Sequence, residues 1–249
     1  MATVAEQPSR PATKRPAKRM TEPFGGGTPM ALLALTVTAL GFWRTFFSQL
    51  GNIDTAHMLH GASSTGWLVL VLVQSSLIRS RDFRLHRILG WSSVVLFAIL
   101  LVTSWHMMTL MLGPGAALPF DLAKLFAYSD VTALPLLVIA YAAAIYYRKD
   151  RHLHSRLISV TLLAGLLPAA ARMFNRIWPG MDGLIFSMHP TYLLIMTVLA
   201  VAIYVDWKND RLRWPFPFAF GWFSVSYVTL FPAYGSGRFD SVARLIAGT

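Results

Sequence analysis

Apolar residues in this chain come in long runs, and polar residues gather in the short stretches between them. A run of about 20 mostly apolar residues matches the thickness of a bilayer core and predicts a membrane-spanning helix. We expect seven such helices, at residues 30–50, 55–78, 88–112, 126–147, 156–178, 185–206 and 214–233. The pattern predicts an all-α integral membrane bundle with one transmembrane domain over residues 30–235.

Two segments flank this domain. Residues 1–29 are rich in Pro, Gly, Lys and Arg, and we interpret them as a disordered basic cytoplasmic tail. Residues 236–249 are interpreted as an outer-side C-terminal tail. Because proline lacks the N–H that a helix interior needs, we expect Pro190 in the first turn of the sixth helix.

The composition supports a membrane protein. Hydrophobic residues make up 55% of the 249 residues and charged residues only 13%, whereas a soluble domain carries about 25% charged residues. The absence of cysteine excludes disulfides, thiolate metal sites and iron–sulfur clusters. The net charge of +11 comes from Lys and Arg in short loops, so we predict a lipid bilayer and no nucleic acid as the partner.

The positions of the Lys and Arg residues predict an orientation. They concentrate in the N-terminal tail and in the segments 79–87, 148–156 and 208–213, which fall on one side of a seven-helix bundle. Basic loops stay in the cytoplasm, so the N-terminus is expected inside and the C-terminus in the periplasm. The predicted location is the bacterial inner (plasma) membrane.

A layer of ionisable residues is expected near the outer ends of the helices. His57 and His60 lie three residues apart, hence on one helical face, and Ser64 follows one turn deeper. Ionisable groups inside a bilayer are costly and often functional. With this topology the same layer receives further side chains from the other helices: Arg44, His106, Asp130, Arg172, Arg176 and His189.

The main hypothesis for this layer is a bound metal ion or b-type haem. His57, His60, His106 and His189 are the candidate ligands, because histidine is the commonest metal ligand and supplies axial nitrogens to haem iron. We expect His60, His106 and His189 to converge on a Zn or Fe ion or a haem. Asp130, Ser64 and the arginines Arg44, Arg172 and Arg176 would support the ligands or bind haem propionates. This hypothesis gives a redox or metal-dependent protein, with electron transfer to a redox partner.

Two other functions remain open. The arginines and histidines could line a site for an anionic substrate, which indicates a transporter or proton-coupled permease. Small residues on the second helix instead favour an accessory subunit that packs among other membrane subunits. A structural alternative is that Arg44 and Arg176 reach the headgroups and that Asp130 and Arg172 only form an ion pair.

A second group of histidines lies at the cytoplasmic helix ends. We interpret its members as residues at the membrane–water interface: His86, His152 and His154.

No familiar enzyme motif is present. The sequence lacks a P-loop, a Gly-x-Ser-x-Gly elbow, a His-Glu-x-x-His motif and a dinucleotide-binding fingerprint. We therefore assign no catalytic residue, and the question of enzyme or non-enzyme stays open.

Two blocks of sequence carry a resemblance. The stretch from Gln74 through His86-Arg87-Ile-Leu-Gly90, preceded by His60, and the block from His154 to Arg172 resemble a family of uncharacterised bacterial multi-pass inner-membrane proteins. The resemblance covers about half of the chain and implies localisation and fold without an activity. The His-Arg-x-x-Gly corner is also similar to corners in transmembrane b-type cytochromes and oxidase-assembly membrane proteins, which favours the haem hypothesis.

Overall fold

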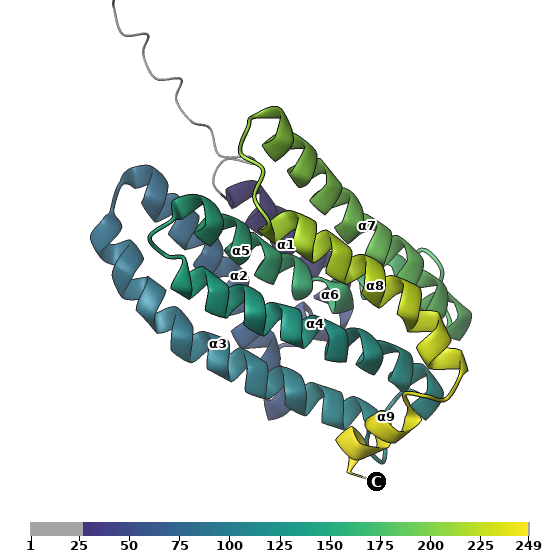
Figure 1. Ribbon diagram of the computed structural model, residues 1–249. Helices are drawn as coiled ribbons and strands as arrows, with labels where there is room; N and C mark the ends of the chain where they lie inside the picture. The colour runs from purple at the N-terminus through teal and green to yellow at the C-terminus, as the bar shows by residue number, and fades with distance from the viewer. Residues whose placement is uncertain (1–26, 249) are drawn as a thin grey trace, which may run out of the picture.

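A computed structural model describes residues 27–248 of the chain, apart from the side chain of Met181. Every regular element formed by these residues is a helix, and no strand occurs among them (Figure 1). Most of the predicted tail 1–29 lies outside the described residues. The elements are α1 (Thr28–Phe42), the π-helix η2 (Trp43–Phe47), α2 (Thr55–Ser80), α3 (Phe83–Leu112), α4 (Phe120–Tyr146), α5 (Arg151–Ala164), α6 (Leu167–Asn175), α7 (Met181–Lys208), α8 (Pro215–Gly235) and α9 (Asp240–Ala247).

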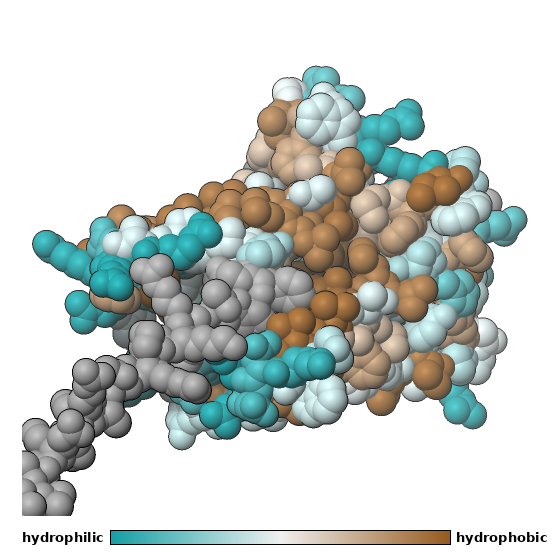
Figure 2. Space-filling model, turned by 90° about the horizontal axis from the view of Figure 1, so that it is seen from above, coloured by the Kyte–Doolittle hydropathy of each residue, from teal (hydrophilic) through white to brown (hydrophobic). Residues whose placement is uncertain are grey.

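The structure confirms the all-helical prediction, and the length and apolar character of the helices suit a membrane protein. Six helices are long and apolar enough to cross a bilayer, and the pair α5 and α6 passes the same test as one bent unit. Large apolar side chains remain exposed on the outside of the bundle, for example Val102, Leu193 and Val228 at 70%, 65% and 70%. Apolar groups cover much of the middle of the face drawn in Figure 2, with hydrophilic groups towards its margins. Such a surface suits contact with lipid chains.

The fifth predicted helix is not continuous. Residues 156–178 were expected to form one span, but α5 ends at Ala164 and α6 starts at Leu167, with an angle of 42° between them. Pro168 explains the break, because a proline in the first turn of α6 has no N–H to donate to a carbonyl of α5. The result is two half-length helices that meet inside the bundle.

Two other predicted helix boundaries differ from the structure. Pro190 was expected in the first turn of the sixth helix, but α7 begins at Met181 and Pro190 lies in its interior. The first predicted helix, 30–50, is α-helical only to Phe42 and continues as the π-helix η2. A π-helix inside a transmembrane segment widens one turn and is frequently found at functional sites.

Helices pack both on their neighbours in the chain and on helices that are distant in sequence. α2 packs on α3, α4 on α5 and α8, α7 on α8, and α6 lies between α1 and α7 (Figure 1). The approach of α1 to α6 depends on Gly41, because a Cβ there would lie 2.2 Å from the carbonyl oxygen of Ala169.

The rings of Trp67, Phe97 and Tyr141 form a buried aromatic core, with the rings of Phe97 and Tyr141 stacked at 4.0 Å between their centres.

The predicted C-terminal tail contains an ordered helix, α9, that packs against α3 and α4. Lys124 of α4 is buried and donates to Asp121, at 3.3 Å, and to Asp240 at the start of α9. The buried ammonium ties the last helix to the bundle.

Within residues 27–248, most of the Lys and Arg residues lie in the connections 81–82, 147–150 and 209–214 and in the helix ends beside them. We call this end of the bundle the basic end. The opposite end carries the connections 48–54, 113–119 and 176–180 and the helix α9.

Candidate functional site

His57 lies at the start of α2 and is exposed. Asp54 caps this helix, because its Oδ1 accepts from the backbone N–H of Ala56 at 3.0 Å and of His57 at 3.1 Å. The other carboxylate oxygen lies 2.6 Å from His57 Nδ1. The His57 backbone N–H, supported by its ring, holds the pKa of Asp54 below the usual value of 3.8. His57 is thus engaged by its own helix cap at the surface.

His60 lies one turn further along α2 and is half-buried against α3. Its Nδ1 is 3.3 Å from Thr103 Oγ1, and Thr103 itself donates to the Ile99 carbonyl at 2.9 Å. Because the Thr103 proton is used in that bond, His60 Nδ1 is the donor to Thr103 and Nε2 keeps its lone pair. Ser64 Oγ lies 3.5 Å from this Nε2. The His60 ring therefore presents Nε2 on the side of Ser64.

The other two predicted histidine ligands have different surroundings. His106 on α3 is exposed, and its ring makes no hydrogen bond to any described residue. His189 on α7 lies 2.6 Å through Nδ1 from the hydroxyl of Tyr227 on α8, and its ring stacks on Phe231 at 4.6 Å. It lines a shallow, mainly apolar pocket of about 350 Å³ between α7, α8 and the loop before α7. His60, His106 and His189 thus share no hydrogen-bond partner among the described residues.

The arginine candidates divide into two kinds. Arg44, in the π-helix η2, and Arg176, at the end of α6, are both exposed, which fits side chains that reach towards headgroups. Arg172 is exposed as well, but its guanidinium stacks over the ring of Phe42 at 4.7 Å and its Nη1 donates to the Pro168 carbonyl of its own helix at 3.1 Å. Arg172 alone combines a place among several helices with donors left over.

Arg172, Asp130 and His60 form an electrostatic cluster. Arg172 on α6 lies within electrostatic range of Asp130 on α4 and of His60 on α2. No direct ion pair between Arg172 and Asp130 occurs within residues 27–248. The hydroxyl of Tyr192 on α7 also lies within range of Asp130 and is 3.5 Å from Ser129 Oγ. Four helices therefore contribute polar groups to one region, which we call the Arg172 cluster (Arg172, Asp130, His60 and Tyr192).

Metal binding at the predicted outer layer stays a prediction. In residues 27–248, no group of three or more His, Asp, Glu or Cys side chains is placed to hold an ion. Haem iron needs only two axial ligands, and the lone pair of His60 Nε2 fits that role as well as it fits a proton acceptor.

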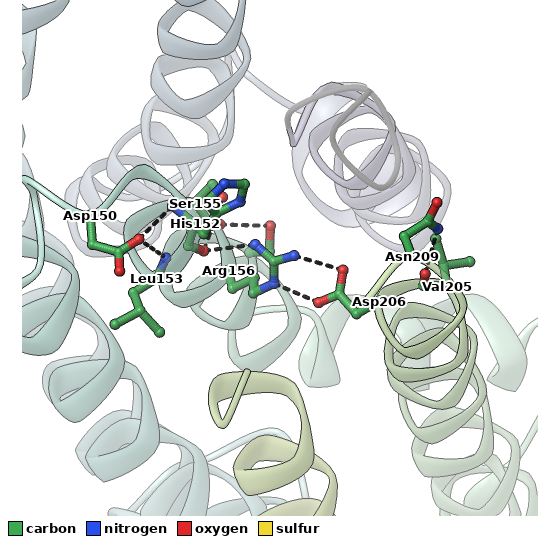
Figure 3. Close-up of polar contacts among 9 residues, drawn as sticks. Asp150, His152, Leu153, Ser155, Arg156, Val205, Asp206 and Asn209 are labelled. Carbon is green, nitrogen blue, oxygen red and sulfur yellow. Dashed lines mark hydrogen bonds and ion pairs between the residues drawn. The ribbon is translucent and has the colours of Figure 1, made fainter. Parts of the chain in front are cut away.

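A buried ion pair near the basic end was missed in the sequence. Arg156 on α5 donates from Nε to Asp206 Oδ2 at 2.5 Å and from Nη2 to Oδ1 at 2.7 Å (Figure 3). A third bond runs from Nη1 to the His152 carbonyl at 2.9 Å. The side chains are 2% and 0% exposed, so both charges are fully enclosed between α5 and α7.

We had interpreted Arg156 as one of the loop cations that define the orientation. Asp206 could have indicated the ion pair, because it is an acidic residue in the last turns of a mainly apolar span. Such a residue predicts a cationic partner at the same depth on another helix, and Arg156 satisfies that condition.

Comparison of the chain with protein families, with curated proteins and with solved structures found no match. The resemblance to uncharacterised inner-membrane proteins therefore stays a prediction, and the function has to be argued from the geometry.

Proposed function

We propose that the chain is a seven-span bacterial inner-membrane protein, with the N-terminus in the cytoplasm and the C-terminus outside. Six single helices and the bent pair of α5 and α6, taken as one broken span, support the count of seven spans. The cations of the basic end support the orientation. Reporter fusions after Ser80, Asp150 and Asp210 should all report the cytoplasm. A periplasmic signal from any one of them would overturn this topology.

The proposed function is proton-coupled transport of a small anionic molecule. The observation that supports it is that Arg172 uses one of its N–H donors in a bond to a described residue and leaves the others open. A guanidinium has five N–H donors and suits carboxylates and phosphates. Only one bond from Arg172, to the Pro168 carbonyl, occurs among the described residues. Arginine inside a membrane protein otherwise pairs or marks a substrate path, so its open donors favour an anion as the missing partner.

The backbone around Arg172 supports this function. α6 is the second half of a broken span, and discontinuous helices form many transporter binding sites. Phe42, which stacks on Arg172, directly precedes the π-helix η2. Phe46 of this π-helix packs against Gly61, the neighbour of His60. Both irregular segments of the bundle thus border the Arg172 cluster.

Asp130 supplies the proton coupling in this proposal. Arg172 and ionised Asp130 carry opposite charges, so the pair is neutral before substrate arrives. An anion would add an unbalanced negative charge in a region where such charge is costly. Protonation of Asp130 removes that imbalance, so anion and proton bind together.

The test is transport in proteoliposomes that contain a pH-sensitive dye. Inward gradients of phosphate, sulfate or succinate should drive proton uptake for at least one of the three anions. Arg172→Gln should reduce the rate at least tenfold. Asp130→Asn mimics the protonated carboxyl, so it should still bind the anion but no longer take up protons.

Arg176→Gln is the matched control, because Arg176 lies one turn further along the chain, outside the Arg172 cluster, and should keep the wild-type rate. If none of the three anions drives proton uptake, or if Arg172→Gln transports like the wild type, the transport proposal is wrong. An absorption spectrum and metal analysis of the same preparation test the metal and haem hypothesis. A haem or metal that is lost in His60→Asn would support that hypothesis instead.

A further inference from the structure

Two histidines meet at the basic end, away from the Arg172 cluster. His86 near the start of α3 and His154 near the start of α5 have ring centres 6.5 Å apart, with ring planes at 83°. Both rings are half-buried. The transport proposal uses neither of them.

The same local structure places both rings. Asp82 caps α3 and Asp150 caps α5, and each histidine follows its cap by four residues. The backbone N–H of His86 donates to the Asp82 carbonyl at 3.1 Å, and that of His154 to the Asp150 carbonyl at 2.9 Å. Equal distances from the two caps set both rings at the same height in the bundle, where the packing of the helices brings them together.

His154 is oriented in the manner of a metal ligand. Its Nδ1 lies 2.8 Å from the Ala144 carbonyl, which can only accept, so Nδ1 carries the proton. Nε2 then keeps its lone pair. Metal-binding histidines usually donate their other ring nitrogen to a carbonyl or carboxylate in this way, which fixes the tautomer and the ring orientation.

Buried polar atoms without partners lie beside this pair. His86 Nδ1 and Gln74 Oε1 are buried and make no hydrogen bond to any residue of the described part of the chain. Gln74 Nε2 donates to the His86 carbonyl at 3.1 Å, which fixes the orientation of the amide and leaves Oε1 as an acceptor. An unpaired buried polar atom costs about 1–3 kcal/mol and usually indicates a bound water or ion.

We propose that His86 and His154 bind one divalent transition-metal ion, with Gln74 Oε1 as a further oxygen ligand. With metal–nitrogen bonds of about 2.1 Å and ring nitrogens about 1.1 Å from the ring centre, the two ring centres would be about 5.2 Å apart at a tetrahedral ion and about 6.4 Å apart at a linear one. The observed 6.5 Å needs side-chain movements of about 1 Å or less.

The ligand types select the class of metal. Imidazole nitrogens suit Zn²⁺, Cu²⁺ and Ni²⁺, whereas Mg²⁺ and Ca²⁺ prefer sites made of oxygen. The Asp150 carboxylate at the start of α5 offsets part of the surrounding positive charge. The N–H of Leu153, followed by that of His152, lowers the pKa of Asp150 and keeps it ionised.

The experiment is titration of the full-length protein, purified without a polyhistidine tag, with Cu²⁺ and with Zn²⁺. We expect one saturable ion per chain, and nitrogen hyperfine structure in the electron paramagnetic resonance spectrum of the Cu²⁺ form. His86→Asn and His154→Asn should each weaken binding at least tenfold. Asp182→Asn is the control, because this exposed carboxylate lies in the first turn of α7, at the end of the bundle opposite His86 and His154.

The binding results for the wild type and the variants support or overturn the shared metal site. Thermal unfolding of the two variants without metal establishes that they fold. For folded variants, loss of binding in both, with retention in the control, supports a shared site. Absence of saturable binding in the wild type, or loss in only one of the two variants, overturns it and leaves a water molecule as the partner of the buried atoms. If either variant fails to fold, Gln74→Leu takes its place with the same expected loss.

Discussion

The ion pair between Arg156 and Asp206 offers a sharp test of the packing between α5 and α7. Both charges are enclosed, at 2% and 0% exposure, and two bonds of 2.5 and 2.7 Å join them. Asp206→Ala leaves the guanidinium buried without its partner. Removal of one member of a buried pair costs about 3–5 kcal/mol, because the remaining charge stays desolvated.

This cost converts to a large shift in the midpoint of thermal unfolding. For a chain of 150–250 residues, each kcal/mol lowers Tm by about 2–4 °C, so Asp206→Ala should lower Tm by roughly 6–20 °C. The measurement is thermal unfolding in a mild detergent, followed by circular dichroism. Lys208→Ala is the control, since this exposed lysine lies two residues further on, and it should change stability by less than about 1 kcal/mol.

A double variant separates the charge from the packing. Arg156→Met with Asp206→Leu replaces both charges by apolar side chains of similar size, and such replacements are often neutral or stabilising. The double variant should therefore be more stable than Asp206→Ala. If Asp206→Ala and Lys208→Ala lower Tm equally, the pair does not lie in a desolvated interface and the reasoning fails.

Two further predictions concern single positions. Gly41→Val should weaken the packing of α1 on α6 and lower Tm by several degrees, because its Cβ would lie 2.2 Å from the Ala169 carbonyl oxygen; an unchanged Tm would contradict this close approach. Asp54→Ala should remove the cap of α2 in a pH-dependent way. Since the folded-state pKa of Asp54 is lowered, its contribution is complete above about pH 3.8 and is lost as the pH falls through the lower folded value, so the difference in Tm between wild type and variant should shrink below pH 3.8.

Local features of the fold could be predicted from the sequence. Apolar runs identified the regions that became long helices, because the length needed to cross a bilayer is a property of the single segment. The short polar stretches also fell between helices, where Asp54, Asp82 and Asp150 cap the elements that follow. A helix cap depends on contacts within one turn, so its position can be predicted from the sequence. The break had a local signal in Pro168 as well, but residues 156–178 were expected to form one continuous helix.

The candidate site could be predicted only in part. Depth along each helix placed Asp130, Arg172 and His60 in a common layer, and the structure brings these three within electrostatic range. The same depth argument grouped His106 and His189 with them, but depth says nothing of the direction in which a side chain points. His106 lies on the exposed side of α3, and His189 faces the aromatic rings of α8.

The rotation of each helix about its axis was decided by the tertiary structure alone. In a soluble protein a polar face marks the outside, but here the lipid-facing and core-facing sides are both apolar, so hydropathy does not separate them. Trp67 is 3% exposed in the core and Trp105 is 51% exposed, although both occur in apolar spans. The pairing of Arg156 with Asp206 and the meeting of His86 with His154 follow from these rotations. The sequence determines where the long apolar helices form, and the packing between them determines which side chains meet.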